Sequence, residues 1–454
     1  MVVFRRRLIF WLIKAYIKKS GKTLIISFLL GLFIFFGLLF ASKYFVKIFP
    51  IYKKVTIGVV GAYTQENLPP IVVEKISRGL TSLSKDGTIK PDLASNWKVE
   101  NDGKVYTFYL KKGVHFSDKK EVTSDLISYN FSDATIERPD KYTIVFKLKD
   151  AYSPFLATVS RPLLRKGSVG TGDYEIEDIK LNGNYVQSLT LGSVKNRLDR
   201  IRFQFYPTED ALKIAFLLGE VSEANGLSDK NFNKVSFDNF KNTEINKGIN
   251  YSRLVTLFFN TEDKVLSDKK IRLGLSYAIP DSFIEGQRTH MPYSPESLFI
   301  NRDLLEKKQD YEHARLLLDA SSIASGSAAV LPELTIKTFK KYRPVANSIA
   351  SSWRELGVNT KIEDVDRVPD SFQIFLGDFY LPKDPDQYTL WHSGQKNNIT
   401  RYKNLRIDKL LEDGRKTVDL EERKSVYADF QKYLTDDVPA IFLYFPTEYQ
   451  VKRK

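Results

Sequence analysis

The chain has 454 residues, no cysteine and a formal net charge of +14. The lack of cysteine excludes disulfides, thiolate catalysis and cysteine metal sites. The positive charge does not indicate nucleic-acid binding. The first 54 residues contain eleven Lys or Arg and no acidic residue, and removing those eleven charges leaves +3 for residues 55–454. A nucleic-acid interface would instead be a basic face of the folded part.

The N-terminal 54 residues are predicted to hold the chain at a membrane. Residues 23–42 are twenty consecutive uncharged positions, and a helix of that length spans about 30 Å, the thickness of a hydrocarbon core. The excess of Lys and Arg before this run predicts a cytoplasmic basic segment at 1–22 and a large domain outside. Residues 43–54 would form a stalk, and Leu8–Ile17 an interfacial helix. A buried helix, or a signal sequence cleaved near Ala41, is the alternative.

Periodicity and turn residues predict a mixture of strands and helices downstream of the stalk. In chain order, we expect a strand at Val55–Val60, a helix at Ile71–Leu83, a hairpin at Val99–Leu110, strands at Tyr142–Leu148 and Ile201–Tyr206, helices at Glu209–Leu218 and Ile271–Ala278, a linker at Ala320–Ala329, a strand at Leu334–Thr338, a helix at Val345–Leu356, and strands at Asn359–Glu363 and Phe372–Leu376. The late strand–helix–strand unit indicates parallel sheet. The whole pattern favours a mixed α/β protein of two lobes.

The most informative stretch follows the last of these strands. It contains three aspartates, an aromatic residue and a histidine: Asp378, Asp384, Asp386, Trp391 and His392. The Asp-Pro-Asp-Gln segment cannot lie inside a strand or a helix, because proline removes a donor and restricts the residue before it. Carboxylates just past the end of an α/β strand lie where such folds bind ligands. A solvated, Asp-rich turn is the alternative.

Signatures of catalysis are lacking in the sequence. It contains neither G-x-S-x-G nor H-E-x-x-H, and no two of its four histidines are three or four residues apart, so no helical metal pair is available. We therefore expect no enzyme activity and no cofactor.

A series of short motifs gives a more specific indication. In chain order they are Gly79–Thr81, Asp86-Gly87, Pro91–Trp97, Asp102-Gly103, Leu110–Phe116, Gly170–Tyr174, Asp268–Arg272 with Ala278-Ile279, Leu356–Val358, Asp378, Asp384–Gln387, His392-Ser393, Asn397-Asn398, Tyr402–Asn404 and Asp408–Leu411. Each motif alone is weak, but the set in this order resembles the family 5 extracellular solute-binding proteins. These are the peptide-, oligopeptide- and nickel-binding receptors of ABC importers.

The resemblance implies a two-lobed α/β fold of the periplasmic-binding-protein type (type II, large cluster) with an extra domain. The one transmembrane helix predicted from the uncharged run would precede it. The implied boundaries are listed by part: lobe I at 55–84 and 166–260, an extra β-rich domain at 85–165, lobe II at 261–435, and a return to lobe I at 436–454. Such a receptor works by closure of its lobes on a hinge, without covalent chemistry.

The resemblance also implies a binding site for peptides. In peptide-binding relatives, an aspartate just after the strand pairs with the ligand ammonium, and Asp378 matches that position. The longer loop here makes Asp384 the alternative. Lys340 lies where some relatives place an arginine for the ligand carboxylate, although a solvated loop lysine is the slightly favoured interpretation.

Other residues could complete the cleft. Tyr63, Tyr174 and Trp391 could line it with flat, partly polar surface, or could pack in the core instead. Gly172 is expected to permit a close backbone approach. A single histidine near the cleft could still ligate a metal chelate, as in the nickel-binding branch.

We therefore interpret the chain as a membrane-anchored, monomeric solute-binding protein outside the cytoplasmic membrane. It would capture a peptide-like ligand between two lobes and deliver it to the permease subunits of an ABC importer. Alternatives are a surface sensor or scaffold that kept the fold without transport, binding of a metal chelate or a sugar, and an extracytoplasmic hydrolase, for which no catalytic constellation is found.

Overall fold

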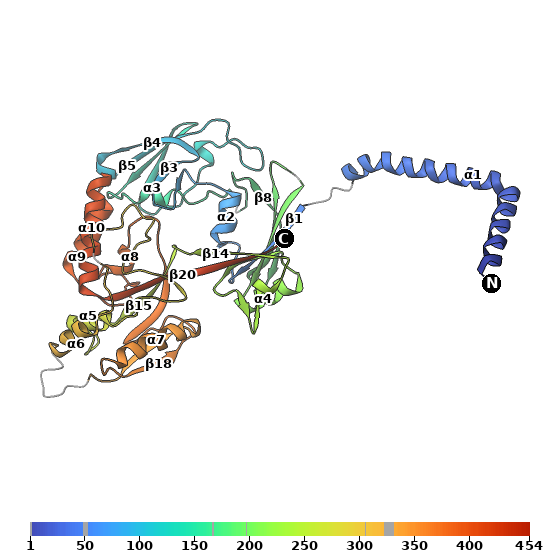
Figure 1. Cartoon of the computed structure of the whole chain (residues 1–454). Helices are drawn as coiled ribbons and strands as arrows, with labels where there is room; N and C mark the ends of the chain where they lie inside the picture. Colours follow the sequence, from blue (N-terminus) through green and yellow to red (C-terminus); the bar gives the residue numbers. More distant parts are fainter. Residues whose placement is uncertain (1, 49–52, 166–167, 197, 305, 322–330) are drawn as a thin grey trace. The chain divides into compact units, whose positions relative to one another are not determined.

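The computed structural model describes residues 2–48, 53–165, 168–196, 198–304, 306–321 and 331–454 (Figure 1). The chain divides into two units. One contains residues 1–54 with 196–200, and the other contains residues 55–195 with 201–454. Most of the predicted linker at 320–329, and part of the predicted stalk at 43–54, lie outside the described residues.

The first unit contains α1 (Val2–Ile48), in which Ser20 departs from helical geometry with φ −124° and ψ 16°. By length and composition, no single helix in the described part of the chain is suited to cross a membrane. The pair Ile13–Thr23 and Ile25–Phe40, which is bent by 60°, could do so together. The transmembrane span at 23–42 therefore stays a prediction.

The second unit is built on one twelve-stranded mixed sheet. Its strands, in spatial order, are β18 (Thr360–Asp364), β17 (Leu334–Thr338), β19 (Ile374–Tyr380), β15 (Arg253–Phe259), β20 (Ala440–Arg453), β11 (Glu223–Leu227), β1 (Lys53–Val60), β10 (Asp199–Tyr206), β9 (Tyr185–Ser193) and β8 (Tyr174–Asn182), with β14 (Thr243–Ile249) and β16 (Gly286–Arg288) also paired to β20. The parallel pairing of β17 with β18 confirms the predicted strand–helix–strand unit.

Three smaller sheets and nine further helices complete this unit within the described residues. The sheets are β4 (Ala94–Glu100), β5 (Val105–Leu110), β7 (Thr143–Leu148) and β6 (Ala134–Asp140); β2 (Thr81–Leu83) with β3 (Ile89–Pro91); and β12 (Asn231–Phe232) with β13 (Val235–Ser236). The helices are α2 (Pro70–Ile76), α3 (Phe155–Thr158), α4 (Glu209–Leu218), α5 (Lys269–Tyr277), α6 (Tyr311–Asp319), α7 (Arg343–Arg354), α8 (Tyr388–Trp391), α9 (Leu405–Lys416) and α10 (Leu420–Asp437).

The strand β15 separates two hydrophobic cores. Val255, Leu257 and Phe259 face the core that α5 and α7 cover, whereas Leu254 and Phe258 face the core formed with α8, α9 and α10. Because both faces of β15 are buried, its sequence is nearly continuously apolar instead of alternating.

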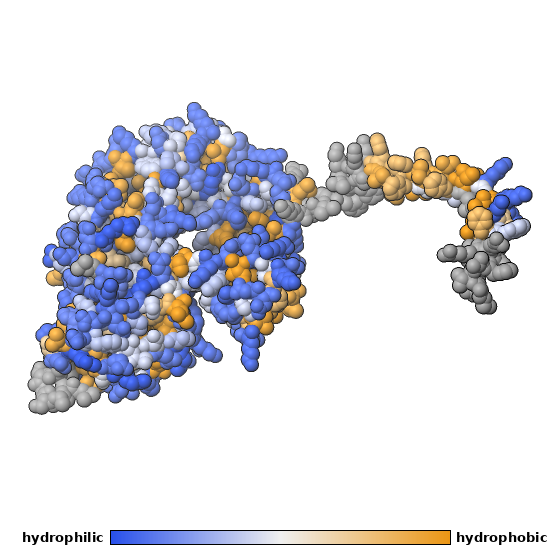
Figure 2. Space-filling view, viewed as in Figure 1, coloured by the Kyte–Doolittle hydropathy of each residue, from blue (hydrophilic) through white to orange (hydrophobic). Residues whose placement is uncertain are grey.

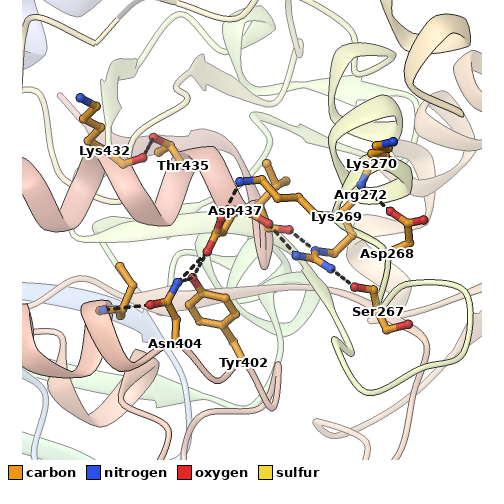
Figure 3. A network of polar contacts seen from close by, with 12 residues as sticks. Ser267, Asp268, Lys269, Lys270, Arg272, Tyr402, Asn404, Lys432, Thr435 and Asp437 are labelled. Carbon is orange, nitrogen blue, oxygen red and sulfur yellow. Dashed lines mark hydrogen bonds and ion pairs between the residues drawn. The ribbon is translucent and has the colours of Figure 1, made fainter. Parts of the chain in front are cut away.

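A polar network fixes the end of α10 against α5 (Figure 3). The buried Arg272 guanidinium donates to the backbone carbonyls of Leu266, Ser267, Asp437 and Val438 at 2.7–3.0 Å. The Asp437 carboxylate in turn accepts from Lys269 Nζ at 2.7 Å, and from Tyr402 and Asn404. The Asp268–Arg272 motif thus has a structural role, because it satisfies carbonyls at the helix end.

Two of the expected elements end more than two residues away from their predicted ends. The helix predicted at 71–83 ends at Ile76, because Ser77 is extended and its hydroxyl donates to the Leu163 carbonyl. The strand predicted at 372–376 runs on to Tyr380, because β15 pairs with it along its full length. Asp378 therefore lies inside β19 and not in a loop after it, which corrects the expected position.

The segment 170–172 packs closely on the end of α2, and a substitution of Gly170 tests how close this packing is. A Cβ at this position would meet the Ile76 carbonyl oxygen at 1.9 Å, so backbone must move. We expect Gly170→Ala to lower the free energy of unfolding by about 1–3 kcal/mol. Gly248→Ala is the control, because nothing lies within 4 Å of its Cβ. Urea unfolding of both variants measures this, and equal midpoints would contradict the close approach.

Candidate ligand-binding site

The most concentrated charge cluster in the predicted site surrounds Asp378. Its carboxylate accepts from Arg253 Nε at 2.8 Å and also from Arg253 Nη2, from Lys341 Nζ at 3.1 Å, and from the Tyr342 hydroxyl at 2.6 Å. Only 8% of the Asp378 side chain is exposed. We call these four residues the Asp378 cluster.

The topology of the sheet brings this cluster together. Asp378 lies opposite Val255 in the β15–β19 register, so Arg253, two residues before Val255, is a diagonal neighbour on the same face. Lys341 and Tyr342 come from a short 3₁₀ turn, η4 (Lys340–Tyr342). That turn follows β17, the parallel neighbour of β19, so three adjacent strands converge on one carboxylate.

Electrostatics keep Asp378 ionised. Burial raises the pKa of Asp378, but the Lys341 and Arg253 cations and the Tyr342 hydroxyl together outweigh it, so the pKa lies below its usual range. Burial lowers the pKa of Lys341, and Asp378 offsets this only in part. The cluster therefore contains two cations and one anion.

Two side chains from the part of the unit that contains β1 and α4 interact electrostatically with the cluster. Burial and Tyr380 raise the pKa of Tyr63 while Arg253 lowers it, so these three side chains are within electrostatic reach of one another. Glu209, at the start of α4, raises the pKa of Lys341. Figure 2 shows this unit hollowed on the viewed face, between the region of α2 and β8 and that of α8 and β15. Tyr63 is thus within electrostatic reach of Arg253, a partner of Asp378, while its ring packs on Phe205 with 5.1 Å between centroids.

The carboxylates of Asp384 and Asp386 have internal partners instead. Asp384 forms a buried bidentate pair with Arg423 of α10, at 2.7 and 3.0 Å. Asp386 pairs with Arg415 of α9 at 2.9 Å, and burial raises its pKa despite that cation. Both ion pairs attach the Asp-Pro-Asp turn to helices. A ligand contact at either residue stays a prediction.

Trp391 and His392 lie on the same short segment. Trp391 is 2% exposed, belongs to the core with α9 and α10, and donates to Gln387 Oε1 at 2.8 Å. Core packing, the alternative interpretation, is thus what the structure shows for it. His392 stacks on Tyr388 with 4.2 Å between ring centroids and lies 3.4 Å from Glu412. In the described part of the chain, no group of three His, Asp or Glu side chains could hold a metal ion.

Gly172 and Tyr174 line a different cavity, of about 640 Å³, together with Lys75, Arg78 and His115. A Cβ on Gly172 would meet the Lys75 carbonyl oxygen at 2.2 Å, which confirms the expected close backbone approach. None of these residues belongs to the Asp378 cluster.

Lys340, predicted from the sequence, does not join the cluster, whereas its neighbour Lys341 does. Lys340 is exposed, and no acidic partner lies within ion-pair distance of it among the described residues, whereas Lys341 binds Asp378. The sequence prediction missed Lys341, Arg253 and Tyr342. Arg253 could have been noticed as the only charge in the apolar run of β15, because a charge that begins a buried strand requires a partner.

Comparison with known proteins identifies the fold of the chain and its protein family. The chain is a mixed α/β, two-lobed protein with the periplasmic-binding-protein fold, as its structural neighbours are. The sequence model of the bacterial extracellular solute-binding proteins, family 5, matches residues 88–400, and the chain belongs to this family.

Three similar proteins illustrate the relationship. The oligopeptide-binding protein AppA of Bacillus subtilis is 22% identical over 82% of this chain and 80% of its own length. The crystal structure of the substrate-binding protein CtaP of Listeria monocytogenes superposes with a TM-score of 0.75 at 20% identity, over 88% of this chain and 94% of that one. NikZ of Campylobacter jejuni, in complex with Ni(L-His), gives 0.73 at 22% identity over the same shares.

The pair of Asp384 with Arg423 leads to a stability prediction. Asp384→Ala leaves a buried guanidinium without its anion, so we expect the free energy of unfolding to fall by about 3–5 kcal/mol. Asp413→Ala is the control, because its pair with Lys409 is largely exposed and contributes at most about 1 kcal/mol. Urea unfolding monitored by tryptophan fluorescence measures both. Similar small losses would show that Asp384 is not a structural anchor.

Proposed function

We propose that this chain captures a peptide-like ligand between its two lobes, outside the cytoplasmic membrane, and delivers it to an ABC importer. The observation that carries the proposal is the Asp378 cluster, with Tyr63 and Glu209 within its electrostatic reach, in a chain of the solute-binding family. A cleft with charged groups on one wall and an aromatic residue on the other suits a polar, flexible ligand. The protein acts by binding alone and has no enzyme activity in this proposal.

The proposed arrangement of parts is the one that the sequence indicates. Lobe I comprises 55–84 and 166–260, the extra domain 85–165, and lobe II 261–435, with 436–454 returning to lobe I. The separate four-stranded sheet of β4 to β7 supports an extra β-rich domain within 85–165. We propose a fold of type II and a monomeric receptor.

We further propose that residues 23–42 anchor the chain in the membrane, with 1–22 in the cytoplasm and the large domain outside. The support is the uncharged run and the excess of basic residues before it, together with the bent helix pair that could span by length and composition. An anchor would keep the receptor near its transporter without a lipid-modified cysteine.

The ligand can be identified directly. We expect the purified chain to retain short peptides, detectable by mass spectrometry after denaturation, and expect Arg253→Ala to retain at least about tenfold less, because a charge-assisted contact is lost. Arg343→Ala is a matched control, because Arg343 pairs with the exposed Asp364. Retention of a nickel chelate or a sugar would favour those alternatives, and an empty protein would favour a sensor or scaffold.

The anchor is tested by removing it. Residues 45–454 should be soluble and monomeric after expression, because the apolar run lies upstream. In intact cells, added protease should digest the large domain of the full chain. A truncated protein that stays with membranes, or a domain fully protected from protease, would overturn the anchor or its orientation.

A further inference from the structure

We propose that a second cavity, lined by the end of α5, the start of α6 and the end of α10, binds a small zwitterion of the free amino acid type. The ligand carboxylate contacts His290 and Lys307 inside the cavity, and the ligand ammonium stays at its mouth. The cavity has a volume of about 920 Å³, and no residue of the Asp378 cluster lines it. The site is therefore separate from the proposed cleft, and the inference does not depend on the proposed function.

Two half-buried cations line this cavity without an anion at close range. Arg288 Nη1 donates to the backbone carbonyls of Phe442 and Leu443 at 2.5 and 2.8 Å. Lys307 Nζ donates to the Thr435 carbonyl at 2.9 Å. In the described part of the chain, no carboxylate lies within ion-pair distance of either cation, and burial lowers the pKa of both, that of Arg288 to about 10. Because a desolvated cation without an anion is costly, a ligand carboxylate stabilises this region.

The arginine also determines which proton His290 presents to the cavity. Arg288 Nη2 lies 3.1 Å from His290 Nδ1, and a guanidinium can only donate, so Nδ1 accepts. Burial and the two cations lower the pKa of His290 to about 3, so the imidazole is neutral and carries its proton on Nε2. That nitrogen lies 3.6 Å from the Glu306 carboxylate, which is too far for a hydrogen bond. The Nε2–H and two donors of Lys307 are therefore available to a carboxylate.

The mouth of the cavity carries the opposite charge. Five exposed carboxylates line it: Asp303, Glu306, Asp310, Glu312 and Asp436. The cations of the same lining are Arg288, Lys307 and the exposed Lys308, so three positive charges against five negative charges leave −2. An ion with negative charge alone is repelled at this mouth, whereas a zwitterion places its carboxylate on the inner donors and its ammonium among the outer acids.

Apolar side chains complete the lining and indicate what the zwitterion carries. Tyr277, Met291, Leu304 and Ile441 belong to it, and the ring centroid of Tyr277 lies 5.9 Å from Lys307 Nζ. A mostly apolar wall with a few convergent polar groups is typical of small-molecule sites. We therefore expect an amino acid with an apolar side chain.

The first experiment measures which charges of the ligand are needed. The full-length chain in mild detergent is tested by thermal shift with leucine, methionine and phenylalanine, and calorimetry then compares the strongest of these with its amide, its N-acetyl form and inorganic phosphate. We expect the amide to bind at least about tenfold more weakly, because the charge-assisted contact inside the cavity is lost. The N-acetyl form should bind at least about threefold more weakly, because an exposed pair contributes less.

Three outcomes would overturn the proposal. They are a lack of thermal shift with all three amino acids, an amide that binds as tightly as the parent, and phosphate or the N-acetyl form binding as tightly as the zwitterion.

Variants locate the binding. Lys307→Met should lower the affinity for the amino acid at least about tenfold, and without ligand it should melt at or above the wild-type temperature, because a buried cation without an anion is removed. His290→Phe removes the Nε2 donor and tests the site by a second route. Lys270→Met is the matched control, because Lys270 also donates to a backbone carbonyl, that of Ala320 at 2.7 Å, but is exposed. Wild-type affinity in both Lys307→Met and His290→Phe would contradict the site.

The two proposed sites are distinguished by Arg253→Ala. Loss of amino-acid binding in Arg253→Ala, with wild-type binding in Lys307→Met, would place the amino acid in the cleft and overturn the second site. Loss in Lys307→Met alone supports the second site, whether or not the purified chain retains peptides.

Discussion

The strand β20 is the element on which the rest of the second unit depends. Its first half pairs with β15, from Ala440 to Tyr444, and its second half pairs with β14, from Thr447 to Arg453. Pro446, between the two halves, donates no backbone hydrogen bond. Because β20 is shared between two sets of partners, the residues at this transition, together with the link 250–252 between β14 and β15, would have to bend in the proposed hinge closure.

The Asp378 cluster determines the charge of the proposed cleft. Burial of the Asp378 carboxylate would be very costly without partners, so Arg253, Lys341 and Tyr342 offset that cost in the folded state. Because one anion holds two cations, these cations are already oriented before any ligand arrives. Preorganisation of this kind lowers the entropy that binding must offset.

Much of this fold could be predicted from the sequence because local signals agreed with tertiary contacts. Helix α4 begins after Thr208, whose hydroxyl accepts from Ala211, and ends at the left-handed Gly219, so its predicted bounds were correct. The extent of β19 could not be predicted, because Asp378 is polar and its strand geometry depends on pairing with β15, far away in the sequence. The cations around Asp378 were missed for the same reason: their proximity follows from sheet order, which no local pattern encodes.

The three aspartates also show why a motif alone does not define a site. Asp384 and Asp386 are held by Arg423 and Arg415, whose helices pack beneath the turn, and these pairs make the turn part of the core. Asp378 differs because it pairs with two cations, of which Lys341 is 53% exposed. Exposure of an arginine partner does not separate the three aspartates, because Arg415 and Arg253 are 26% and 28% exposed. All three carboxylates are therefore neutralised by cations within the fold, and the number of cations around each one is what distinguishes them.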